Sequence, residues 1–563
     1  MAVADVETPP GAGTVAPRLF SGRAILASGL LAGVIGAYVV LAGLYAAFAE
    51  RWLIVELLTV SQALLAGTAA VAGWRFAGRG AAAAAPFFAA IGAALAGAVA
   101  GLVLGAVVLF AAAYNLRWIF VSLSPPLLAG LRFGLPPAAS LAVLAGAGAA
   151  LSAAGALCRR LPLGWRRPLL AGLGAVVAAG LFSSLVQTLL STNAVTARLG
   201  DLLYVYDGLL PSGGALVFAV AAAGTALRGW PTARSGVGRL LPPDRWRRRI
   251  AIAVGIAVIV AMPVATNQFI AQVMTIVGLY VLMGFGLNIE LGLAGLLDLG
   301  FVAFFAVGAY TVALLTANGA LAVAHLTFWE ALPVAMALAA AAGFVFGLPV
   351  LRVRGDYLAV ATLGLGEIVR VLVLSDMLKP ALGGSQGIID IPRPSIGAFT
   401  LASPVEIAYL ALAACAAAAW CAWRMQHSWL GRRWLAVRED EDVAQALGID
   451  LVKVKLLAYT IGAAFAGLAG AVFAAMAGAV FPHSFQLLVS INVLALLVVG
   501  GIGSFAGVVI GSLALIGTPE LLREFGEFRY LAYGIVMVAM MRARPGGLWP
   551  AAPHRPRRED RDG

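Results

Sequence analysis

Long runs of apolar residues recur along the whole chain and restrict its fold more than any other feature. The chain has 563 residues, of which 62% are hydrophobic and only 11% are charged. About a quarter of the residues in a soluble domain carry a charge, and an apolar run of about 20 residues can cross a bilayer as a helix. The sequence therefore predicts an all-α, polytopic helical membrane protein.

The apolar runs form two groups, separated by a segment rich in proline and arginine at residues 229–249. This composition is typical of a linker, so we predict a domain boundary there. We expect about sixteen transmembrane spans, about six before the linker and about ten after it. The first group lies near residues 24–48, 52–74, 86–112, 137–157, 168–190 and 212–228, and the second near 250–268, 270–288, 300–317, 331–351, 357–375, 405–423, 456–480, 488–499, 505–518 and 529–541.

Arginine clusters at the ends of these runs predict the orientation of the chain. Membrane proteins concentrate Lys and Arg on the cytoplasmic side, and every span alternates without conflict when clusters such as residues 245–249 are placed inside. Both chain ends are then cytoplasmic, residues 376–404 lie outside, and the net charge of +12 requires no nucleic acid as a partner. The predicted parts are a disordered cytoplasmic tail (1–22), an N-terminal accessory transmembrane domain (23–228), the basic linker (229–249), a second transmembrane domain (250–550) and a charged cytoplasmic tail (551–563).

The longest charged interval between apolar runs in the second half lies at residues 424–455. Four acids at residues 439–442 cluster where the positive end of a helix dipole would lie, and Gly448 follows as a helix stop. Val443, Ala446 and Leu447 predict one apolar stripe on this short helix. We interpret the helix as a lever that pushes against another protein. The alternative is a solvated loop, which is the usual role of a charged run between spans.

Polar residues also interrupt the second group of runs. Asn288, Glu290 and Asp298 flank a glycine-broken stretch at residues 292–300. Helices broken inside a membrane occur where they line a cavity or are buried in protein. The pattern favours two interpretations equally, an element of a pathway or gate and an ordinary turn with polar residues.

Glu367 and Arg370 are three residues apart within one apolar run, so they share a helix face. Ionisable groups at membrane depth usually face an interior path or one another. A structural ion pair that locks two helices is the favoured alternative to a role in a path. The candidates to line a substrate pathway are Asn288, Asp298, Tyr310, Glu367 and Arg370.

Glycines at intervals of four predict places where two helices pack closely, because the absence of a side chain lets backbones approach. They occur once in each half of the chain, at Gly97, Gly101 and Gly105 and at Gly503, Gly507 and Gly511.

The sequence contains no motif of an enzyme or of a nucleotide-binding protein. It has no GxxxxGK[ST] or HExxH, and its three cysteines match no disulfide or metal spacing. The glycines at residues 501–503 lack the strand and acidic partner of a dinucleotide site. We therefore expect no catalytic residue, no metal site and no cofactor bound by this chain.

Six blocks of the second half carry a family resemblance. They are GLNIELGLAGLLDLGFVAFFAVGAY (286–310), RGDYLAVATLGLGEIVRVL (354–372), GGSQGI (383–388), GRRWLAVREDEDVAQALGIDLVKVKLLAYTIGAAFAGLAGA (431–471), VLALLVVGGIGSFAGVVIGS (493–512) and RPGGLWP (544–550). In this order, the blocks resemble the membrane subunit of branched-chain amino acid ABC importers of the LivM type. The resemblance covers about residues 250–550 and implies a permease in a bacterial inner membrane.

The resemblance also implies partners and site residues. The partners are a second permease, two ATPase subunits that use ATP and Mg, an extracytoplasmic substrate-binding protein and membrane lipid. The segment that docks on the ATPase corresponds to Arg438, Glu439, Asp440, Ala444 and Gly448. The loop on the side of the binding protein corresponds to Gly383, Gly384, Ser385, Gln386 and Gly387.

The first half departs from the family pattern, because the usual member has a much shorter N-terminal part. A fused partner permease would bring a docking helix of its own. Residues 1–240 contain no such helix, so we interpret them as an accessory domain. Three alternatives stay open for the whole chain. They are a permease of the same family for urea or short amides, an ion-coupled secondary transporter with Glu367 as its proton or cation site, and a non-transporting scaffold.

Overall fold

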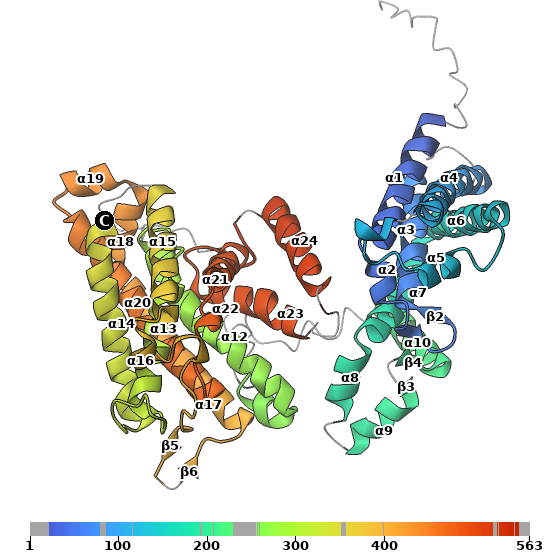
Figure 1. The fold of residues 1–563 in the computed structure, drawn as a ribbon. Coiled ribbons are helices and arrows are strands. Elements are labelled where there is room, and N and C mark those ends of the chain that lie inside the picture. Colours follow the sequence, from blue (N-terminus) through green and yellow to red (C-terminus); the bar gives the residue numbers. More distant parts are fainter. Residues whose placement is uncertain are drawn as a thin grey trace, which may run out of the picture. The chain divides into compact units, whose positions relative to one another are not determined.

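The computed structural model divides the chain into two compact units, Met1–Pro243 and Asp244–Gly563. It describes residues 22–78, 86–114, 116–191, 194–205, 208–228, 255, 257, 259–350, 356–397, 399–521, 526, 528–544 and 546–550. The predicted linker at 229–249, the C-terminal tail and nearly all of the N-terminal tail lie outside these residues. The described parts are mostly helical, as the sequence predicts (Figure 1).

The first unit is built from six longer helices and several short elements. The longer helices are α1 (Gly22–Leu41), α3 (Val60–Phe76), α4 (Pro86–Ala113), α6 (Pro137–Arg160), α7 (Leu163–Leu181) and α10 (Pro211–Arg228). The short helices are α2 (Leu44–Ala47), α5 (Pro125–Leu131), α8 (Ser183–Leu190) and α9 (Ala194–Leu203).

Close packing of α4 against α6 depends on the glycine stripe. A Cβ atom on Gly97 would lie 2.1 Å from the carbonyl oxygen of Gly148, and one on Gly101 would lie 2.2 Å from that of Leu144. A Cβ atom on Gly105 would lie 2.5 Å from Cδ2 of the Leu141 side chain. The prediction of a close helix contact at this stripe is confirmed, because no side chain fits between the two backbones.

A small four-stranded sheet was not predicted. It pairs β1 (Trp52–Ile54) with β2 (Leu58–Thr59), and β4 (Gly208–Leu209) with β3 (Tyr204–Val205), while β1 and β4 join the two hairpins in parallel. The apolar run near 52–74 is therefore not one helix. Thr59 caps α3, because its hydroxyl accepts from Gln62 N at 3.3 Å while the Gln62 side chain accepts from Thr59 N at 3.2 Å. The run near 168–190 is likewise broken, at Phe182, into α7 and α8.

The second unit is organised around α12 (Gln268–Leu287) and α20 (Leu451–Ala477), its two most buried long helices. α20 packs against α12, α13, α14 and α17. The other longer helices are α13 (Val302–Thr316), α14 (Phe328–Val350), α15 (Asp356–Leu374), α17 (Pro404–Gln426), α21 (Leu487–Gly500) and α24 (Phe528–Ala543). Short elements are α16 (Lys379–Leu382), α18 (Trp429–Glu439), α19 (Glu441–Ala446), α22 (Phe505–Ser512), α23 (Thr518–Leu521), β5 (Ser395–Ile396) and β6 (Phe399–Thr400).

Two groups of polar segments lie at opposite ends of this bundle (Figure 1). At one end, the indole N–H of Trp434 in α18 donates to the carbonyl of Val454 in the first turn of α20 at 2.9 Å. At the other end, Arg393, just before the β5–β6 hairpin, donates to the carbonyls of Ala475 (3.1 Å) and Met476 (2.8 Å) in the last turn of α20.

Nine of the described helices are long and apolar enough to cross a membrane, and three shorter apolar helical segments, Pro211–Ala226, Val302–Thr316 and Phe505–Leu521, accompany them. The chain is therefore a multi-pass helical membrane protein. The figure of about sixteen spans stays a prediction.

The α4–α6 contact can be tested by adding a side chain to one glycine. Gly101→Val is expected to destabilise the first unit by about 1–3 kcal/mol or more, because the new side chain meets the Leu144 backbone. Gly146→Val is the control, since a Cβ at Gly146 meets nothing within 4 Å. The melting temperature of the full-length protein in detergent measures the difference. Equal melting temperatures for the two variants would contradict the packing.

Candidate functional site

The polar residues at the end of α12 lie in the interior of the second unit. α12 ends at Leu287, and the chain continues as a π-helical segment, Asn288–Leu293. Asn288 and Glu290 are fully buried, and Asp298 is 1% exposed. We call residues 288–301 the broken segment. Of the two interpretations that the sequence left open, this burial favours an interior element over a solvated turn.

Side chains of the broken segment satisfy backbone groups that no helix satisfies. The Asn288 amide oxygen accepts a hydrogen bond from the backbone N–H of Gly503 at 2.8 Å. The Asp298 carboxylate accepts one from the backbone N–H of Gly300 at 2.7 Å. Asn288 thus joins the end of α12 to the turn before α22 and helps to hold the break closed.

Two neighbouring helices hold the other end of the broken segment. The hydroxyl of Thr362 in α15 accepts from the N–H of Leu299, and that of Ser490 in α21 accepts from the N–H of Val302, both at 3.0 Å. Gly300 lies directly on α15, since a Cβ there would be 2.1 Å from the Thr362 carbonyl oxygen. A shift of the broken segment must therefore move α15 or break these bonds.

Glu290 and Asp298 form a buried acidic pair. Both side chains are buried in the broken segment. Both oxygens of Glu290 and the second oxygen of Asp298 have no hydrogen-bond partner among the described residues. Two ionised carboxylates placed together away from water would repel each other, so the pair carries at most one charge. Glu290 was noted in the sequence only as a residue beside the break. Its position directly after the apolar run near 270–288 was the signal that could have placed it among the site residues.

The charged interval forms two short helices, α18 and α19. Asp440 separates them and caps α19, because its carboxylate accepts from the N–H groups of Asp442 (2.9 Å) and Val443 (3.0 Å). The predicted helix therefore begins at Glu441, and the expectation that Glu439 lies at its start was wrong, since Glu439 ends α18. Gly448 has φ +83°, as its predicted role as a stop requires.

Three contacts anchor α18 and α19 to the bundle. Trp434 is fully buried, and Ala444 is 1% exposed. The Glu441 carboxylate lies 2.6 Å from the Lys455 ammonium in α20.

Asp450 caps α20, and the hydrogen bonds from the side chain and backbone of Lys453 hold the pKa of Asp450 below its ordinary value.

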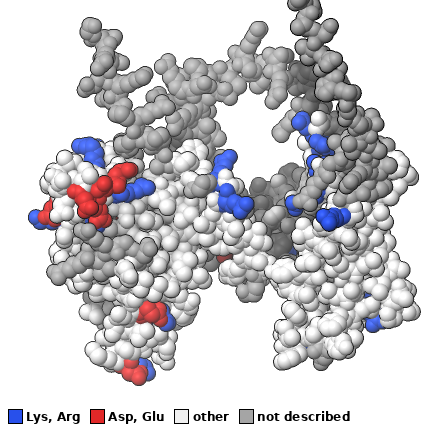
Figure 2. All heavy atoms as spheres, turned by 90° about the horizontal axis from the view of Figure 1, so that it is seen from above, with Lys and Arg blue, Asp and Glu red and all other residues white. Residues whose placement is uncertain are grey.

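The outer face of α19 is apolar and uncovered. Val443 is 54% exposed, and Leu447, which follows the helix, is 76% exposed. Acidic and basic side chains gather over this end of the unit, where the surrounding surface is mostly uncharged (Figure 2). Exposed apolar side chains that are bordered by charged ones, as in this cluster, are typical of a protein-binding face. The predicted stripe thus faces outward, and Ala444 takes the inward position.

Arg438 connects α18 with the broken segment. Its guanidinium donates a hydrogen bond to the carbonyl of Gly292. Its stem lies over Gly295, where a Cβ would be 3.2 Å from Arg438 Cγ and where φ is +76°. The structure therefore brings together two sets of candidates that are about 150 residues apart in the sequence. Sequence spacing carried no signal for this contact.

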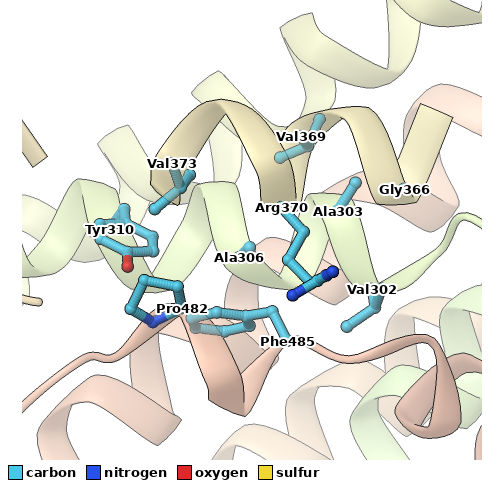
Figure 3. A pocket seen from close by; sticks show the side chains of 10 residues that line it. All are labelled: Val302, Ala303, Ala306, Tyr310, Gly366, Val369, Arg370, Val373, Pro482 and Phe485. Atoms are coloured by element: carbon cyan, nitrogen blue, oxygen red, sulfur yellow. The ribbon is translucent and has the colours of Figure 1, made fainter. Parts of the chain in front are cut away.

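The other pathway candidates lie elsewhere. Tyr310 and Arg370 line a cavity between α13, α15 and the turn at Pro482 (Figure 3). Arg370 Nε lies 3.0 Å from each carboxylate oxygen of Glu367, so these two residues pair within the single helix α15, whereas the expected ion pair was one that locks two helices. Asn288 and Asp298 do not line this cavity. The five pathway candidates therefore divide between two places.

The loop at residues 383–387 is a rigid turn at the opposite end from α19. Gly383, Gly384 and Gly387 have φ of +79°, +55° and +66°, which suit glycine. A Cβ on Gly387 would lie 2.2 Å from the carbonyl oxygen of Val480. Ser385 and Gln386 are exposed between these glycines.

A bundle of apolar helices around an interior break defines a polytopic membrane protein of the kind in which transporters build their pathways. In the described part of the chain, no three His, Cys, Asp or Glu residues lie together as a metal site requires.

The chain belongs to the family described as branched-chain amino acid transport system / permease component, which matches residues 269–542. The high-affinity branched-chain amino acid transport system permease protein LivM of Escherichia coli is 38% identical over 327 residues, which cover 54% of this chain and 75% of LivM. The resemblance seen in the sequence is thereby confirmed. The whole described part of the first unit lies outside the family match.

Two more distant relatives have the same kind of name. The probable branched-chain amino acid transport permease protein LivM of Methanocaldococcus jannaschii is 24% identical and covers 51% of this chain and 94% of its own length. The permease protein LivH of Escherichia coli is 28% identical over 127 residues, which cover 22% of this chain and 41% of LivH. No solved structure matches the chain.

The acidic pair can be tested by an isosteric change. Glu290→Gln is expected to keep the melting temperature in detergent, because the amide has the same shape and the pair holds at most one charge. Glu290→Ala leaves a space beside Gly462, whose Cβ would lie 1.9 Å from Glu290 Oε1, and should cost about 1–3 kcal/mol. A loss with glutamine as large as that with alanine would show that the ionised acid is needed.

Proposed function

We propose that this chain is the permease subunit of an ATP-driven ABC importer and forms part of the path by which branched-chain amino acids cross the inner membrane. The similarity to LivM over 75% of its length carries the substrate class. The chain has no phosphate-binding motif, so two partner ATPases would bind and hydrolyse ATP with Mg. A LivH-like second permease and an extracytoplasmic binding protein would complete the importer.

The α18–α19 end is proposed to face the cytoplasm, together with both chain ends. Exposed Val443 and Leu447, flanked by acids, offer an apolar surface to an ATPase. The anchors at Trp434 and Glu441 make α18 and α19 follow the end of α20. A push on α19 would therefore be passed to the bundle instead of being lost in a loop.

The observation that carries the coupling proposal is the bond from Arg438 to the Gly292 carbonyl. This hydrogen bond joins the docking segment to the broken segment, and the broken segment is itself hydrogen-bonded to α15 and α21. Coupling requires the nucleotide states to prefer different permease conformations. Movement of the broken segment under control of α18 would provide the two conformations.

The rigid loop at residues 383–387 is proposed to face the binding protein. Its glycines fix the backbone, and Ser385 and Gln386 are free to donate and accept hydrogen bonds at the surface.

The function can be tested with the complete importer in lipid vesicles. Uptake of labelled leucine is expected to require ATP, both ATPases and the binding protein. Uptake driven by an ion gradient alone would instead support a secondary transporter. Retention of urea or a short amide by the cognate binding protein would change the substrate class and keep the mechanism.

The docking surface can be tested by adding charge to it. Val443→Asp with Leu447→Asp should abolish co-purification of the ATPases, because two desolvated carboxylates would oppose an apolar contact. Both positions are exposed, so the fold should persist. Ile396→Asp is the control, since Ile396 is 60% exposed at the opposite end. Normal ATPase recovery with the double variant would refute the docking surface.

The link to the broken segment predicts a different defect. Arg438→Gln should leave the ATPases bound but lower uptake about tenfold or more, since a hydrogen bond from a charged group is worth about 1.5–3 kcal/mol. Arg432→Gln, on the same helix and exposed, is the matched control. Uptake and ATP hydrolysis measured together separate the effects. Equal uptake by the two variants would exclude a coupling role for Arg438.

A further inference from the structure

We propose that Arg370, Glu367 and Tyr310 form the point at which the permease binds the zwitterion of its substrate. The guanidinium would bind the α-carboxylate, the Glu367 carboxylate would bind the α-ammonium, and the aliphatic side chain would lie on the cavity wall. This inference rests on the proposed function and names the residues that recognise the amino acid within the membrane.

The lining of the cavity suits an aliphatic amino acid. Apart from Arg370 and Tyr310, the residues that surround it present only apolar atoms or backbone (Figure 3). A site that combines an apolar wall with a few convergent polar groups is the usual design of a small-molecule site. The apolar part of the lining is Val302, Ala303, Ala306, Gly366, Val369, Val373, Pro482 and Phe485.

The polar groups are available for a ligand: Arg370 and Tyr310 line the cavity, and Glu367, which does not line it, is joined to it through the ion pair with Arg370. The Arg370 side chain is 31% exposed and that of Glu367 is 45% exposed, so their ion pair is not sealed in a core. Arg370 meets Glu367 through Nε and Nη2, which leaves Nη1 for another acceptor. The Tyr310 hydroxyl is buried and has no hydrogen-bond partner in the described part of the chain. A buried unpaired hydroxyl is rare in proteins and marks a place where a polar group is missing.

The ion pair matches the charges of a zwitterion. An ammonium and a carboxylate could enter together and exchange partners with Arg370 and Glu367, and no step would leave an unpaired charge at membrane depth. This matters because an uncompensated buried charge is costly, whereas a matched pair can be exchanged at little cost. A bidentate guanidinium–carboxylate contact would also fix the orientation of the substrate.

The described conformation is closed at this site. The cavity leaves room for about one water molecule, so substrate entry requires α15 to move away from α13 and Phe485. Gly366, next to Glu367, rests on Gly300 of the broken segment, where a Cβ would lie 3.2 Å from the Gly300 Cα atom. The segment that Arg438 contacts therefore also supports the helix that carries both charges.

The competing explanation is a structural ion pair within α15. A swap of the two charges separates the explanations. A structural pair works in either order, but a swapped pair would hold the zwitterion reversed and direct its side chain away from the apolar wall. The test compares Arg370→Gln, the swap Glu367→Arg with Arg370→Glu, and Tyr310→Phe in the complete importer.

We expect Arg370→Gln to lower leucine uptake about tenfold or more, as for other charge-assisted bidentate contacts, while the complex assembles and the loaded binding protein still stimulates ATP hydrolysis. The swap should restore any lost melting temperature but not uptake, and Tyr310→Phe should raise the KM for uptake. Uptake restored by the swap, or unchanged in Arg370→Gln, overturns this inference alone. Absence of ATP-driven uptake by the wild-type importer overturns the proposed function as well.

Discussion

In a bilayer, each backbone N–H or carbonyl group that leaves a helix must find a partner inside the protein. The connection between α12 and α13 is where this chain meets that constraint, because residues 294–301 are not helical and, apart from exposed Gly295, are buried or half-buried. Thr362 of α15 and Ser490 of α21 supply missing partners at one end of the break, and Asn288 at its other end accepts from the N–H of Gly503 before α22. The same bonds tie those helices together, so the break organises the interior of the second unit.

The break also explains how distant parts of the second unit are joined. Arg438 approaches it from the surface helix α18, and Gly366 of α15 rests on its other end. A displacement of α18 therefore acts on a segment with few helical bonds of its own, which deforms more easily than an intact helix. By contrast, the described helices α4 and α6 of the first unit approach through glycines and bury no charged side chain between them. That contact suits a rigid support better than a moving part.

Much of the helical architecture could be predicted because hydrophobic periodicity and length report burial in lipid directly. The glycine stripe at Gly97–Gly105 predicted a close contact for a similarly local reason. Small residues on one helix face let the backbone of a neighbouring helix approach closely. The small sheet could not be predicted in this way. β1 and β4 are about 150 residues apart, and strands of two or three residues have no periodicity of their own. The helix boundaries at Thr59 and Asp440 were missed because capping depends on side-chain geometry that a long apolar or charged run conceals.

The sequence by itself determined that the chain is a helical membrane protein, which of its residues are polar within apolar runs, and to which family its second half belongs. These properties follow from composition and from the order of short motifs. Only the tertiary structure decided that Asn288 and Asp298 lie in the interior break while Tyr310 and Arg370 line a separate cavity, and that Arg438 reaches Gly292. The physical reason is that such contacts join residues from different helices, and the packing angles and offsets between helices depend on all of their side chains together.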